Sequence, residues 1–221
     1  MADDHAVPGY ERAKLSMPAA ASARPESIRV SNLRGRAIDA ALKMVEARGP
    51  EAMNLRELAR ELGTGPASLY HHFANKDALM AELAVEGFRR LRAAFVAALN
   101  ERRGRSALHA CGDAYLKFAR TRPRLYRLMY AERILTSHPV VRQAEAAAFQ
   151  TFAEGLSPAE PSSAVLEDRA IALWAFGRGI AALTLSAADG DGPPPRELSR
   201  QIVRGLESLM GQTIRTPRSG D

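Results

Sequence analysis

The sequence predicts an all-α protein, in which an N-terminal three-helix unit is joined by one long helix to a C-terminal helical bundle. Apolar residues recur at the three- and four-residue spacing of helices, and no segment alternates apolar and polar residues as a strand would. Glycine and proline separate these periodic segments, where they end one helix and begin the next. Helices that each carry one apolar stripe and have short connections pack as a bundle.

Four segments follow from the composition along the chain. Residues 1–30 contain several prolines, lack lasting periodicity and have equal numbers of cationic and anionic side chains, so we expect a disordered N-terminal arm. An arm that enters a minor groove is the alternative. We expect the three-helix unit over residues 31–91, the helical bundle over residues 92–215 and a polar tail over residues 216–221.

Length and composition set only broad limits. The chain has 221 residues, of which 46% are hydrophobic, so it can bury a sizeable core. Its single cysteine, Cys111, excludes an internal disulfide framework and, with no signal-peptide pattern at the start, favours the cytoplasm. The net charge of +6 lies mainly after residue 90, because residues 31–90 hold nine Lys and Arg against eight Asp and Glu. Overall basicity therefore does not by itself indicate nucleic-acid binding.

The segment from Asn54 to Phe73 has the pattern of two short helices joined by a glycine-bearing turn. Asn54 is a favourable N-cap, Gly63 suits the end of the first helix and Pro66 suits the start of the second, which we expect to reach Phe73. This is the arrangement of a helix-turn-helix, although an ordinary helical hairpin would show the same periodicity. The apolar residues of the first helix share one face: Leu55, Leu58, Ala59 and Leu62.

Helices are also expected before and after this segment. One runs from Leu33 to Arg48, and a long one runs from about Lys76 to Arg103, capped by Asn75. At about 1.5 Å per residue the long helix is about 40 Å long, enough to join two domains. Within the bundle, residues 170–188 are apolar almost all round, which predicts a central buried helix. Arg178 is their single charged residue and argues against a membrane span.

Four stretches of the sequence resemble a known family. Residues 69–79 read LYHHFANKDAL, which resembles the LYxHFxxKxxL signature of the tetracycline-repressor (TetR) family, and residues 58–63 match that family's LAxxLG. In the second half, residues 114–129 and 174–179 resemble the ligand-binding domain of the WHG-type members, with Arg178 where histidine is usual. The resemblance implies a ligand-responsive DNA-binding transcriptional regulator.

The resemblance implies that Tyr70 and Lys76 contact DNA phosphates and that Arg56 reaches a guanine edge, although a solvated surface position is the alternative for each cation. The family usually has an apolar residue at Thr64 and Ser or Thr at Gly65, so a capping hydroxyl is missing here. Because few of these side chains can read bases, we expect DNA shape to contribute to specificity. The remaining candidates for DNA contact are Pro66, Ala67, Ser68, His71 and His72.

Aromatic and thioether side chains in the bundle either line a ligand pocket or fill the core. Arg178 is the more specific candidate, because a buried charge needs an internal carboxylate, an anionic ligand group, or a place at solvent or the subunit interface. The other candidates for ligand contact are Tyr115, Phe118, Met129, Tyr130, Phe149 and Trp174.

These patterns together predict a regulator, most simply a repressor that a small apolar or amphipathic effector releases from a near-palindromic double-stranded operator. We expect a homodimer formed through the last two long helices, with no membrane association. An activator of the same family is one alternative, and a bundle enzyme or carrier with a vestigial helix-turn-helix is another. The sequence has no catalytic motif, no cofactor-binding motif and no metal-ligand spacing, so catalytic residues, cofactors and metals are not expected.

Overall fold

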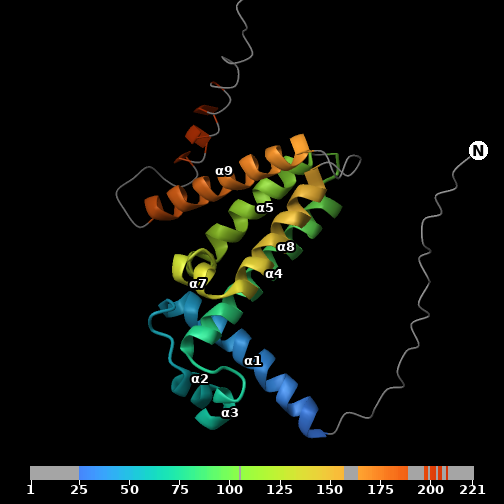
Figure 1. The fold of residues 1–221 in the computed structure, drawn as a ribbon. Coiled ribbons are helices and arrows are strands. Elements are labelled where there is room, and N and C mark those ends of the chain that lie inside the picture. Colours follow the sequence, from blue (N-terminus) through green and yellow to red (C-terminus); the bar gives the residue numbers. More distant parts are fainter. Residues whose placement is uncertain are drawn as a thin grey trace, which may run out of the picture.

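The computed structural model describes residues 25–104, 106–156 and 164–188, and eight positions between residues 197 and 208. The described chain is all-α, and the predicted fold class is confirmed (Figure 1). Helices α1, α2 and α3 form an N-terminal unit, here called the head: α1 Pro25–Arg48, α2 Leu55–Glu61 and α3 Pro66–Tyr70. The remaining helices form the bundle: α4 Lys76–Asn100, α5 Ala107–Thr121, α6 Pro123–Met129, α7 Glu132–Ser137, α8 Pro139–Leu156 and α9 Ala164–Ala188.

Helix α1 begins earlier than the apolar pattern indicated. It starts at Pro25, so the last part of the segment expected as an arm, residues 25–30, is helical. Proline is well suited to the first helical position, and no glycine or second proline interrupts the chain before Leu33. The sequence before residue 31 shows no lasting apolar period and so gave no signal of this first turn. Residues 1–24 lie outside the described part of the chain.

The turn between α2 and α3 is built from the predicted signals. The side chain of Asn54 accepts a hydrogen bond from the Arg56 N–H at 2.8 Å, which caps α2, and Gly63 ends it with a φ of +66°. Helix α3 begins with Pro66 and ends at Tyr70, three residues earlier than expected, because the chain then closes into a turn on the Leu69 carbonyl.

Replacement of Gly63 by Ala should destabilise the protein by about 1–2 kcal/mol, since a side chain disfavours the left-handed conformation. Gly65→Ser is the matched control, because Gly65 has a φ of −74° and a Cβ there meets nothing within 4 Å. A serine hydroxyl at this N-cap should leave stability unchanged or raise it. Urea denaturation measures both values, and equal losses in the two variants would contradict the role assigned to Gly63.

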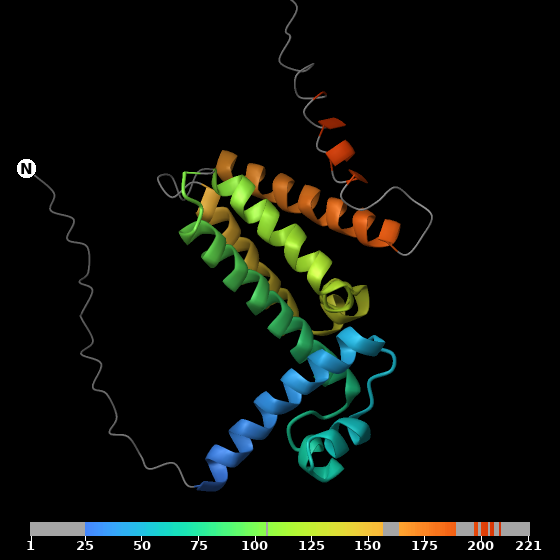
Figure 2. The same cartoon turned by 180° about the vertical axis from the view of Figure 1, so that it is seen from behind.

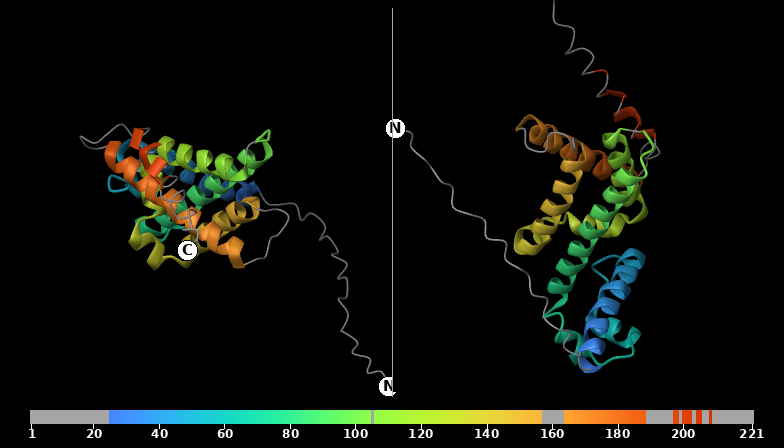
Figure 3. Two further views of the ribbon diagram at one scale, coloured as in Figure 1. Left: turned by 90° about the horizontal axis from the view of Figure 1, so that it is seen from above. Right: turned by 90° about the vertical axis from the view of Figure 1, so that its right-hand side faces the viewer.

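Helix α4 joins the head to the bundle, as predicted. It has 25 residues, which corresponds to about 37 Å, and Asn75 caps its first turn by accepting from the Ala78 N–H at 2.8 Å. Leu79 and Leu83 are fully buried near its start, and Phe95 is fully buried near its end. The right-hand view of Figure 3 shows the head at one end of α4 and the bundle around its other end.

Helices α5 and α8 pack against α4, and α9 lies across α5 and α8 (Figure 2). The side chain of Leu99 on α4 packs into the space that Gly155 leaves on α8, where a Cβ would lie 2.5 Å from Leu99 Cδ1. The short helix α7 was not predicted. In the part of the chain that the structure describes, no helix is both long and apolar enough to cross a membrane.

The expectation that residues 170–188 form a central buried helix is wrong. Helix α9 covers the bundle with one face, whereas Ile171 and Leu183 on the other face are 51% and 55% exposed. A helix with apolar side chains on every face is expected to be buried on every face. The sequence does not indicate whether the same chain or a second subunit covers each face.

Candidate functional site

Helix α3 exposes the side chains that the sequence placed outward. Leu69 is fully buried and anchors the helix, whereas Tyr70 is 47% exposed and Ala67 and His71 are exposed beside it. Of the other predicted contact residues nearby, Gly65 and Pro66 are exposed and Thr64 and Ser68 are half-buried. The structure therefore brings these candidates together on the surface of α3 and the adjoining turn. Figure 1 shows α3 at the outer end of the head.

His72 and Lys76 lie at the edge of this surface and have partners within the chain. The His72 ring is half-buried, with its centroid 6.3 Å from that of Phe73, which fits the packing role expected of it. The Lys76 Nζ is exposed but donates to the Glu51 carbonyl at 2.7 Å, and this bond ties the start of α4 to the loop after α1. Its contact with a DNA phosphate stays a prediction.

Arg56 projects from the first turn of α2 and is exposed. Its neighbour Glu57 is held by Arg48 of α1 at 2.8 Å, so a rigid turn carries Arg56. Arg60, which the sequence analysis did not single out, is exposed one turn later. The four-residue spacing places both arginines on one side of α2 and could have identified Arg60.

The bundle core contains three tyrosine hydroxyls in mutual contact. The Tyr115 hydroxyl lies 3.0 Å from that of Tyr126 and donates to that of Tyr130 at 3.1 Å. Burial raises the pKa of all three phenols well above the ordinary value. They are therefore neutral donors and acceptors, capable of binding a polar group but not of acting as phenolate bases near neutral pH.

Aromatic rings fill the space beside these tyrosines. The Trp174 ring lies 5.5–5.6 Å from Tyr115, Phe149 and Phe152, and 6.0 Å from Phe95, between ring centroids. We call these five residues the aromatic cluster. It unites three of the predicted ligand-contact residues, and its rings are packed against one another.

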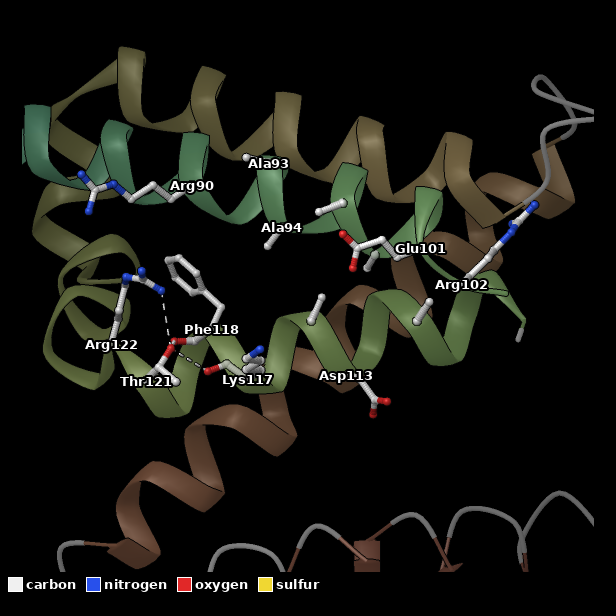
Figure 4. A pocket seen from close by; sticks show the side chains of 14 residues that line it. Arg90, Ala93, Ala94, Glu101, Arg102, Asp113, Lys117, Phe118, Thr121 and Arg122 are labelled. Carbon is white, nitrogen blue, oxygen red and sulfur yellow. Dashed lines mark hydrogen bonds between the residues drawn. The ribbon is translucent and has the colours of Figure 1, made fainter. Parts of the chain in front are cut away.

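Phe118 and Met129 lie elsewhere. Met129 packs against Gly87, where a Cβ would lie 2.5 Å from its sulfur, and Phe118 lines a groove between α4 and α5. That groove has a volume of about 600 Å³, with alanines such as Ala93 and Ala94 between charged ends (Figure 4). The sequence did not indicate this groove, because its residues come from two helices.

Arg178 is not the buried charge that the sequence indicated. Its side chain is 42% exposed, because it reaches from α9 to the edge of the core. Its guanidinium lies 4.2 Å from the Tyr130 ring centroid, and its Nη1 lies 3.6 Å from a Glu145 oxygen. The internal carboxylate considered for Arg178 is therefore Glu145.

The structure gives no support to redox or metal chemistry in its described residues. Cys111 is fully buried, and burial raises the pKa of its thiol to about 11, so the thiol stays protonated and packs as a small apolar group. Within the described ranges, no three His, Cys, Asp or Glu side chains are placed to hold a metal ion.

Two protein families match this chain, one in the head and the start of α4 and the other in the bundle. Residues 37–83 match the family described as bacterial regulatory proteins, tetR family, and residues 108–206 match a tetracycline repressor-like C-terminal domain. The chain is similar to the uncharacterized HTH-type transcriptional regulator YobS of Bacillus subtilis (strain 168). The two are 34% identical over 89 residues, which are 40% of this chain and 47% of YobS.

Solved structures share the same fold. A protein of unknown function from Rhodococcus sp. RHA1 is 29% identical, with a TM-score of 0.64 over 78% of this chain and 94% of that chain. The multidrug binding protein EbrR, complexed with imidazole, is 24% identical, with a TM-score of 0.53 over 78% of this chain and 89% of that chain.

Proposed function

Because the chain belongs to the TetR family of bacterial DNA-binding transcriptional regulators, we propose that it is a repressor that binds a near-palindromic operator as a homodimer. When a small apolar or amphipathic ligand binds the bundle, the repressor is released from the operator. The observation that supports this proposal best is the surface of α3, where buried Leu69 fixes the helix and Tyr70 and His71 stay exposed. Such a helix can enter a major groove without rearrangement.

The exposed face of α9 supports a dimer. Ile171 and Leu183 are among the large apolar side chains that the described chain leaves exposed, and small residues lie between them on the same side of the helix. A continuous apolar face of this kind is typical of an interface, and a twofold contact covers the same face in both subunits. The small exposed residues of this face are Ala172, Ala175, Gly179 and Ala182.

Substitution of both Ile171 and Leu183 by Glu should raise the dimer dissociation constant about a hundredfold or more, since burying an unpaired carboxylate costs about 3 kcal/mol. Sedimentation equilibrium measures the constant. Val140→Glu on α8 is the control, because Val140 is 49% exposed and lies outside α9. A double variant that remains as dimeric as the control would rule out α9 as the interface.

The aromatic cluster and Arg178 are the proposed ligand site. EbrR, which has the same fold, is described as a multidrug binding protein, and aromatic walls suit such ligands. Since the rings fill this space, a ligand must displace some of them. The Tyr130 ring meets Phe88 of α4 edge-on, with centroids 5.3 Å apart, so displaced rings can shift α4 and the head that it carries.

Selection of bound genomic fragments tests the proposed function. Purified protein should enrich a short sequence with twofold symmetry, and a gene near that site should suggest the effector class. The loss of that binding on addition of the effector supports repression with release. An activator would keep its operator in the presence of effector, and the alternative of an enzyme or carrier predicts ligand capture with no retained DNA.

A further inference from the structure

A cleft of about 570 Å³ lies at the junction of the head and the bundle. One wall is the loop at residues 49–51 after α1, together with the first turns of α4. The other wall comes from α6 and α7, which lie next to the end of α1 in Figure 1. This junction cleft shares no residue with the aromatic cluster, and only Lys76 also belongs to the predicted DNA surface.

Cations dominate the lining of the junction cleft. Glu51 is the single acidic residue among the described residues that line it. Like charges gathered in one cleft repel each other unless counter-charges offset them. The cations come from three helices: Lys76 of α4, Arg124 and Arg127 of α6, and Arg133 of α7.

Backbone carbonyls hold three of these cations, of which Arg127 donates to the Leu185 carbonyl at 3.1 Å. The Lys76 Nζ donates to the Glu51 carbonyl at 2.7 Å, and Arg124 donates to the carbonyls of Glu46 and Ala47 at the end of α1. A carbonyl orients a cation but does not cancel its charge. The carboxylate of Glu46 accepts the Leu125 N–H at 2.8 Å.

Arg133 pairs with a carboxylate that is not among the residues lining the cleft. Its Nη1 lies 2.5 Å from Oδ1 of Asp77, and the His138 ring contacts Oδ2 at 2.8 Å. The hydrogen bond from His138 and the charge of Arg133 lower the pKa of Asp77, so this carboxylate is ionised at neutral pH. The Arg133 side chain is 70% exposed and retains donors that can contact a ligand.

The floor of the junction cleft is apolar. Met80, Leu128 and Ile134 line it, and each is at most 4% exposed. Apolar walls strengthen the field of the neighbouring cations and offer contact to carbon atoms. Cations from three helices above an apolar floor fit a tetrahedral oxyanion that is attached to an organic body.

We propose that the junction cleft binds a small organic phosphate, whose oxygens accept hydrogen bonds from Lys76, Arg124 and Arg133. The organic part lies against the apolar lining, in which Pro50 and Ala131 are half-buried. The bound phosphate would accept hydrogen bonds from the Lys76 ammonium. It would also bridge the loop at residues 49–51 and α7. Its effect on DNA rests on the proposed function: the ligand withdraws Lys76 from a DNA phosphate, and by linkage DNA weakens ligand binding by the same factor.

Calorimetric titration of the full chain with phenyl phosphate, without DNA and at constant ionic strength, tests the site. We expect saturable binding, and weaker binding of inorganic phosphate because it lacks the apolar part. Arg133→Gln and Lys76→Gln should each weaken phenyl phosphate binding about tenfold, the effect of one charged hydrogen bond. Arg120→Gln is the control, since Arg120 is exposed on α5 outside the cleft. Unsaturable binding, or equal losses in all three variants, would overturn the site.

DNA retention in the presence of phenyl phosphate separates this proposal from the proposed function. A fall in operator affinity that Arg133→Gln removes supports the coupling, because Arg133 belongs to the bundle and is not expected to touch DNA. Saturable binding with unchanged operator affinity overturns the coupling. If the chain retains no DNA at all, the proposed function fails, and the calorimetry still decides whether the cleft binds the phosphate.

Discussion

Replacement of Phe95 by Ala should lower the free energy of unfolding by about 3–5 kcal/mol. Phe95 is fully buried, and its ring lies between the rings of Tyr115, Phe152 and Trp174. Removing it deletes buried apolar area and leaves a cavity that helices α4, α5 and α9 cannot close by a simple shift, since each is fixed by other contacts. Within the cluster, Phe95 contacts rings from three other helices, α5, α8 and α9.

Urea denaturation measures this loss, and Trp174, the single tryptophan of the chain, reports it by fluorescence from within the cluster. Val96→Ala provides the matched control, because Val96 is the next residue of α4 and is 44% exposed. We expect its change in stability to stay within about 0.5 kcal/mol. A loss below about 1 kcal/mol for Phe95→Ala would mean that the cluster is loosely packed, as an open ligand pocket would be.

Local signals in the sequence were sufficient for the turn between α2 and α3. Asn54, Gly63 and Pro66 each act on the backbone of their own turn, and the structure shows all three in the expected positions. The beginning of α1 escaped prediction because the sequence before residue 31 shows no lasting apolar period. The six-residue helix α7 escaped because it is too short to establish a period.

Contacts between distant segments could not be read from the sequence. His138 and Asp77 are separated by 61 residues, and the carbonyl that receives the Lys76 ammonium carries no side-chain signal. Arg178 shows a different limit. Its apolar neighbours predicted burial, but the exposed fraction of a residue on α9 depends on which face the chain itself covers. Such facts follow from the assembled fold and not from periodicity.

Arg56→Ala should lower the affinity for the preferred operator by about 1–3 kcal/mol and relax the preference at one base pair in each half-site. The guanidinium is exposed on a turn that the Arg48–Glu57 pair fixes, so little ordering is required when it reaches a guanine edge. The loss should therefore vanish on operators that already carry a substitution at that base pair. Fluorescence anisotropy with a set of single-base operator variants measures both affinities.

Lys76→Ala is the comparison that distinguishes a base contact from a phosphate contact. The Lys76 ammonium lies at the start of α4, and its removal should weaken binding to every sequence alike and reduce the salt slope by about 1. Arg56→Ala should leave the salt slope closer to that of the wild type. It should change the order of affinities for the operator variants. A uniform loss in Arg56→Ala across all operators would assign Arg56 to a phosphate. The base preferences of the protein would then have to come from α3 and from the shape of the DNA.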